Sequence, residues 1–174
     1  MRLSIILAGF FAVLLPAPGA TCDRACLKAS LEMDPTFLPL RNSLAWNYAQ
    51  AGSPERAIEE QGRVVHASGQ NMFYLGILGY FHAMSGGRAE AEAIRRELEA
   101  MKSRRYVSPY VLALIDAAFG EIDRSFERLE EAFRTQDWQL VLLRVDARLD
   151  VLRADPRFDD LLRRAGFPDA SAVK

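Results

Sequence analysis

The sequence has few of the residues on which common catalytic and metal sites depend. Its 174 residues include two cysteines and two histidines, too few for a four-ligand zinc site or a dense disulfide framework. The 22 basic and 23 acidic side chains give a net charge of −1, which argues against nucleic-acid binding. No glycine-rich phosphate loop follows a strand pattern, and no nucleophile lies in a recognisable catalytic setting. Neither a cofactor nor a metal is therefore expected.

The N-terminal apolar run is too short to span a bilayer. Leu3–Leu15 has 13 residues, whereas a transmembrane helix needs about 20. Arg2 precedes the run, and the small or helix-breaking residues Pro16–Ala20 follow it. This pattern is typical of a secretory signal peptide, here residues 1–20. We expect the protein to be exported, to a periplasm or out of the cell, and to be membrane-anchored if the signal peptide is retained.

Cys22 and Cys26 come directly after the predicted cleavage region, four residues apart. In an oxidising compartment two nearby thiols can pair. On a regular helix, however, Cβ atoms four residues apart are separated by about 5–6 Å, wider than the roughly 3.8 Å of a disulfide. Pairing would require Cys22 to lie in a frayed first turn, so both the disulfide and the free thiols remain open.

Four columns of residues recur at a constant interval of 34. They are Leu44, Leu78 and Leu112; Ala45, Gly79 and Ala113; Gly52, Gly86 and Gly120; and Ala57, Ala91 and Ser125. This period is the length of a helix–turn–helix unit that stacks on copies of itself. The sequence therefore predicts an all-α fold, an α–α superhelix or right-handed solenoid of about three repeats with a C-terminal capping helix. The small residues are expected where paired helices approach closely, because a large side chain would force the axes apart.

These columns place the boundaries of one domain over residues 21–174. Repeats are expected at about 38–71, 72–105 and 106–139, with a partial N-terminal helix over 23–34 and a C-terminal cap over 140–166. Within the repeats Gly52 is expected at the left-handed position that ends the first helix, and Gly86 and Gly120 are expected in the corresponding turns. Ser53 and Ser108 are expected to cap the helices that follow them.

With these columns the chain resembles the tetratricopeptide repeat family over roughly residues 23–166. Two features of the family's pattern are weak here. The aromatic residue three positions before the leucine is absent, and the tyrosine of the first helix remains only as Tyr48, with His82 and Asp116 in its column. The resemblance implies a binding scaffold whose concave face is lined by the first helix of each unit.

Under that resemblance, seven residues would line a partner-binding groove: Asn42, Trp46, Gln50, Tyr80, Met84, Tyr110 and Leu114. The set is apolar and aromatic with little charge. Gripping a peptide carboxylate would need lysine and arginine in this set, so that mode of the family is not expected. The expected function is an exported protein–protein interaction scaffold for an apolar or amphipathic peptide segment, with Trp46 and Tyr80 as anchors.

Three alternatives to this function remain open. In the first, neighbouring helices or a partner subunit cover the aromatic rings of the predicted groove. In another, the chain is a self-associating structural module of an envelope complex, and hence a homo-oligomer. The third is a small enzyme that uses His82 as a general base, although a lone histidine at a helix seam is more often a packing residue. We do not expect an enzyme.

Overall fold

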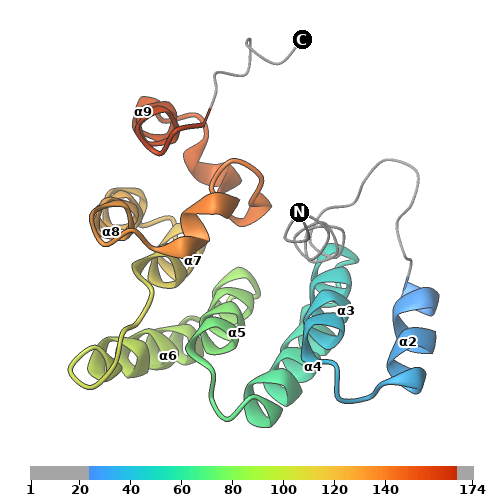
Figure 1. The fold of residues 1–174 in the computed structure, drawn as a ribbon. Coiled ribbons are helices and arrows are strands. Elements are labelled where there is room, and N and C mark those ends of the chain that lie inside the picture. Colours follow the sequence, from blue (N-terminus) through green and yellow to red (C-terminus); the bar gives the residue numbers. More distant parts are fainter. Residues whose placement is uncertain (1–23, 168–174) are drawn as a thin grey trace, which may run out of the picture. The chain divides into compact units, whose positions relative to one another are not determined.

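The described part of the chain is all-helical. The structure is a computed structural model that describes residues 24–167, so the predicted signal peptide and Cys22 lie outside the described residues. Between residues 24 and 167 the regular elements are α-helices and 3₁₀-helices, with no strand (Figure 1). The all-α prediction is therefore confirmed for this range. None of its helices is long and apolar enough to cross a membrane.

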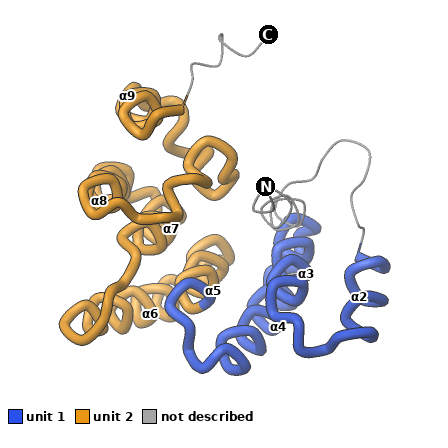
Figure 2. Tube along the Cα trace, viewed as in Figure 1, with its two compact units in different colours: residues 1–74 blue, residues 75–174 orange. Residues whose placement is uncertain are grey.

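The chain divides into two compact units, Met1–Tyr74 and Leu75–Lys174 (Figure 2). Unit 1 holds α2 (Arg24–Met33), α3 (Leu38–Gln50), α4 (Pro54–Ala67) and the start of α5 (Met72–Met84). Unit 2 holds the rest of α5, α6 (Arg88–Met101), α7 (Pro109–Ala118), α8 (Ile122–Arg134), the 3₁₀-helices η1 (Trp138–Leu142) and η2 (Ala147–Leu152), and α9 (Pro156–Arg164).

Glycines with a left-handed backbone follow the first helix of each pair. Gly52, Gly86 and Gly120 have φ angles of +70°, +83° and +73°, in the region that side-chain-bearing residues rarely adopt. The glycine-column prediction is confirmed. The helices that come next, α4, α6 and α8, begin 34 residues apart, so the interval in the sequence is also the interval between helix starts.

The two predicted serine caps differ in outcome. The Ser108 side chain accepts a hydrogen bond from the backbone N–H of Val111 at the start of α7, as predicted. The prediction for Ser53 was wrong, because its side chain makes no capping hydrogen bond to α4. An N-cap residue normally has an extended backbone. Ser108 has ψ 119°, close to that geometry, whereas Ser53 has ψ 65°.

In unit 1, α3 packs against α2 on one side and against α4 on the other. On α2, Leu27 and Leu31 are buried and lie one turn apart. On α4, Ala57 and Val64 are buried and lie two turns apart. Gln61 of α4 is also fully buried, and its side-chain amide donates to the carbonyl of Tyr74 at 2.9 Å. The helix faces that the apolar spacing selects therefore form the core of this unit.

In unit 2, α7 is the central helix, since all its residues from Pro109 to Ala117 are buried. A helix buried all round must be covered by several neighbours. One of them is α5, whose Gly76 and Gly79 face Val111 and Ile115: a Cβ added at Gly76 would lie 1.7 Å from Val111 Cγ1. On α8, the buried Ser125 hydroxyl donates to the carbonyl of Ala113 at 2.9 Å. The small-residue columns thus mark close helix contacts.

Candidate partner-binding surface

Residues 138–152, here called the capping segment, cover the face of α7 that was predicted to line the groove. Tyr110 and Leu114 of α7 are fully buried, and Tyr80 of α5 is 7 % exposed. The capping segment contacts α7 through η2, and its own fully buried side chains are Leu143, Leu149 and Leu152. In this structure the three predicted groove residues belong to the core of unit 2, because the chain's own apolar segment buries against them.

A polar cluster joins Tyr110 of α7 to Asp146 and Arg148 of the capping segment. The Tyr110 hydroxyl donates to Asp146 Oδ2 at 2.8 Å, and the Arg148 guanidinium donates to both carboxylate oxygens of Asp146 at 2.7 Å. Asp146 also accepts the backbone N–H of Arg148 at 3.0 Å, which caps η2. The cluster therefore joins the capping segment to α7, and each of its three side chains has a hydrogen-bond partner.

The pKa values of these groups reflect burial and mutual charge. Burial alone would raise the pKa of Asp146, but the charge and hydrogen bonds of Arg148 hold it below its usual range. Burial and then the charge of Asp146 raise the pKa of Tyr110 well above its usual value. Burial also raises the pKa of Tyr80 to about 12, while the nearby Arg148 charge opposes the shift. The structure thus brings Tyr80 and Tyr110 to one buried, charge-paired cluster.

The other predicted groove residues keep more surface. In unit 1, Asn42 is 9 % exposed, Trp46 is half-buried and Gln50 is exposed. In unit 2, Met84 at the end of α5 is 62 % exposed. The predicted anchors Trp46 and Tyr80 belong to different units.

The outer side of the capping segment carries exposed apolar side chains. Trp138 is 62 % exposed, Val141 55 %, Val145 37 % and Val151 55 %. In a 3₁₀-helix, residues three apart eclipse one another, so Trp138 and Val141 share one side of η1. Four of the eight exposed large apolar residues in the described range lie in this segment. Sequence reasoning missed this surface, because all seven predicted groove residues lie before residue 115.

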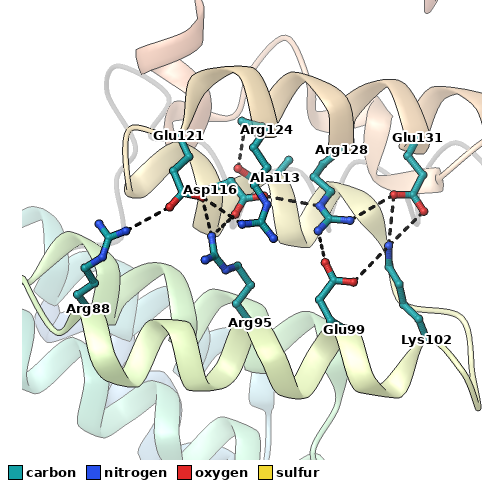
Figure 3. A network of polar contacts seen from close by, with 11 residues as sticks. Arg88, Arg95, Glu99, Lys102, Ala113, Asp116, Glu121, Arg124, Arg128 and Glu131 are labelled. Atoms are coloured by element: carbon teal, nitrogen blue, oxygen red, sulfur yellow. Dashed lines mark hydrogen bonds and ion pairs between the residues drawn. The ribbon is translucent and has the colours of Figure 1, made fainter.

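An ionic network joins α6 to α7 and α8 around the buried Asp116 (Figure 3). Arg95 donates to Asp116 Oδ1 at 2.8 Å, and Arg124 and Arg128 lie 3.6 and 3.7 Å from Oδ2. Further ion pairs join Arg88 and Arg95 to Glu121, Arg128 to Glu99, and Lys102 to Glu131. Burial raises the pKa of Asp116 although three arginines oppose the shift. Each cation of the network pairs with at least one carboxylate, so the network joins the three helices.

His82, the residue of the enzyme alternative, lies near the end of α5. Burial lowers the pKa of its imidazole, and the charge of Glu90 opposes that shift only in part. His82 is therefore neutral at pH 7, and its carbonyl accepts the N–H of Gly87 at 2.8 Å. Among residues 24–167, no three histidine, cysteine, aspartate or glutamate side chains are grouped so that they could hold a metal ion.

The predicted cysteine pairing falls partly outside the described residues. Cys26 in α2 is disulfide-bonded. Cys22, the chain's other cysteine, is not among the described residues.

Comparisons with known proteins do not extend these observations, because no family model, curated protein or solved structure matched the chain.

Proposed function

We propose that the protein is an exported interaction module, similar to tetratricopeptide repeat domains, that binds an apolar or amphipathic peptide segment. In this proposal the pairs α3–α4, α5–α6 and α7–α8 are three repeats of a right-handed solenoid. The 34-residue interval between the starts of α4, α6 and α8 supports it, as do the left-handed glycines that precede them. The capping segment and α9 would then close the C-terminal end, as terminal repeats do in solenoids.

The observation that carries the binding function is the exposed apolar surface of the capping segment. Trp138, Val141 and Val145, here called the apolar row, expose large side chains at spacings of three and four residues. Clustered apolar side chains on a surface are typical of interaction sites, and tryptophan is a frequent anchor. The row has three residues, whereas a standard protein–protein interface has about 20–30 residues a side. A short peptide segment therefore fits it better than a folded partner.

The proposed surface differs from the groove that the sequence predicted. The chain itself covers Tyr80, Tyr110 and Leu114, so a peptide would contact the outer side of the capping segment instead. Trp46 and Gln50 in unit 1 and Met84 in unit 2 retain exposed surface, but they are not part of this proposed surface.

A peptide-display selection followed by binding measurements tests this function. We expect selected peptides to be rich in apolar residues and to change the fluorescence of Trp138 in the wild type. In the double variant Trp138→Ser/Val141→Ser, measured by calorimetry, their affinity should fall at least about tenfold, because anchor truncations cost about 2 kcal/mol or more. Phe37→Ser, which changes a 48 % exposed aromatic residue in unit 1, is the matched control and should bind normally.

Far-UV circular dichroism of the double variant should match the wild type, since both side chains are mostly exposed. Unchanged peptide affinity in a folded double variant would contradict the proposal. Sedimentation of the free protein tests the alternative of a self-associating module. That alternative would be favoured if the mass of the wild type rises with concentration and the mass of the double variant does not.

A further inference from the structure

Three cationic side chains of unit 1 surround one buried tyrosine. Tyr48 of α3 is 5 % exposed. The guanidinium carbons of Arg24 and Arg56 lie 4.9 and 5.7 Å from its ring centroid, and the ammonium nitrogen of Lys28 lies 6.0 Å from it. Arg24 and Lys28 come from α2, and Arg56 comes from the first turn of α4. Three like charges therefore converge on one point from two helices that flank α3.

Within residues 24–167, none of these three cations forms an ion pair with a carboxylate. Arg24 Nε donates to the side-chain oxygen of Asn47 at 3.0 Å, but that amide carries no charge. The acidic residues one turn after Arg56 are already engaged, because Glu59 and Glu60 both pair with Arg63. No described carboxylate, including Glu32 one turn after Lys28, lies within ion-pair distance of the three cations.

The arginines of unit 2 show the contrasting arrangement. There Arg95, Arg124 and Arg128 also converge on one point, but that point is the carboxylate of Asp116, and Glu121 supplies further negative charge. The uncompensated group in unit 1 is thus not a general consequence of arginine content, in a chain whose formal net charge is −1.

The tyrosine ring alone does not balance three charges. A cation over an aromatic face gains only a weak attraction at an exposed site, and the ring has no net charge that could neutralise the cations. All three cations lie within 6.0 Å of the ring centroid.

We propose that Arg24, Lys28 and Arg56 form a binding site for a phosphate group beside the Tyr48 ring. Their side chains offer only hydrogen-bond donors, and guanidinium groups match phosphate oxygens with paired donors. A phosphomonoester carries about −1.5 to −2 charge at pH 7, which suits three cations better than a single carboxylate does. The phosphate comes either from a soluble molecule or from a lipid headgroup. This site is independent of the peptide surface on unit 2.

Titration of the purified protein with inorganic phosphate at constant ionic strength tests the site. We expect saturable NMR shifts of the Tyr48 ring and of the Lys28 and Arg56 amides. Lys28→Gln and Arg56→Gln should each weaken binding about tenfold or more, because a hydrogen bond to a charged group contributes about 1.5–3 kcal/mol. Arg96→Gln, which removes an exposed arginine of α6, is the control with the same change in net charge and should bind normally.

Vesicles distinguish the two sources of phosphate. Binding to phosphatidylcholine vesicles that contain phosphatidic acid, lost in Arg56→Gln and absent without phosphatidic acid, would support the site and identify a lipid headgroup. Saturable binding of inorganic phosphate without vesicle binding would support a soluble source. Equal binding by wild type, Lys28→Gln and Arg56→Gln, or no saturable binding of either source, would overturn the proposal. Both changed side chains are exposed, so the variants should fold, which circular dichroism checks.

Discussion

Replacing Gly76 by alanine is expected to lower the free energy of unfolding of unit 2 by about 3 kcal/mol, the upper end of the range for overpacking a core. The new Cβ would lie 1.7 Å from Cγ1 and 3.2 Å from Cβ of Val111. Val111 is 1 % exposed, so it has no free space into which to turn. Either α5 moves away from α7 or Val111 leaves its rotamer. Urea unfolding followed by circular dichroism measures the loss.

Gly62→Ala is the matched control for this change. Gly62 is also inside a helix, α4, but nothing lies within 4 Å of a Cβ added there. Alanine in place of glycine in a helix is favourable by about 0.5–1 kcal/mol, so Gly62→Ala should stabilise unit 1 slightly. The two substitutions alter the unfolded chain equally, and the difference between them measures packing. Equal effects at the two positions would show that α5 does not approach α7 closely.

A second substitution separates the steric cause from other causes. Val111→Ala alone should destabilise unit 2 through the cavity that it leaves. In the double variant Gly76→Ala/Val111→Ala, the new methyl group occupies space that the valine vacated. We therefore expect the double variant to be more stable than the sum of the two single changes predicts. Strict additivity would mean that the two residues do not compete for the same space.

The parts of the fold that could be predicted depend on local chemistry. Each of the glycines that repeat every 34 residues has the positive φ that favours glycine at a helix end. Ser108 caps α7 because its hydroxyl reaches a backbone N–H three residues away. Ser53 is also a serine that precedes a proline, but its backbone ψ angle differs and it makes no capping hydrogen bond. A cap is therefore predictable from sequence only if the backbone before the helix is also known.

The surroundings of the predicted groove residues depend on contacts between residues far apart in the sequence, which local patterns do not reveal. Helical position correctly grouped Tyr110 and Leu114 on one face of α7, but it could not show that residues 138–152 would return to cover that face. The pairing of Tyr110 with Asp146 spans 36 residues. Such pairings depend on the path of the chain after α8, which no local pattern determines.

The partners of the charged residues could not be predicted for the same reason. Asp116 was noted for its place in the tyrosine column, yet it is fully buried among arginines from α6 and α8. Acidic and basic residues alternate on both helices, and spacing alone does not tell which of them face each other. The cations around Tyr48 were equally hidden, because Arg24, Lys28 and Arg56 come from two separate helices.

Replacing Asp146 by asparagine is expected to destabilise unit 2 by about 3–5 kcal/mol at pH 7, the cost of leaving one member of a buried ion pair alone. Asparagine keeps the size of the side chain, but its single carbonyl oxygen can either cap η2 or accept from Tyr110, because the two hydrogen bonds use different oxygens of Asp146. The charge opposite Arg148, whose side chain is 9 % exposed, also disappears. Asp150→Asn is the control from the same segment: its side chain is 61 % exposed, and the change should cost less than about 1 kcal/mol.

The difference in stability between wild type and Asp146→Asn should depend on pH with a defined sign. The pKa of Asp146 is lower in the folded protein than its ordinary value of 3.8, so its contribution is fully present above that value and is lost as pH falls through the folded pKa. Asp116 acts in the opposite direction, because its pKa is raised, so its contribution is present below pH 3.8 and is lost as pH rises. Since Asp116 is common to both proteins, it cancels in the difference. We expect the difference to be constant from pH 5 to 8 and to shrink below about pH 4.

A difference that stays constant at acid pH, or one no larger than that of Asp150→Asn, would show that the Asp146–Arg148 pair does not hold the capping segment against α7.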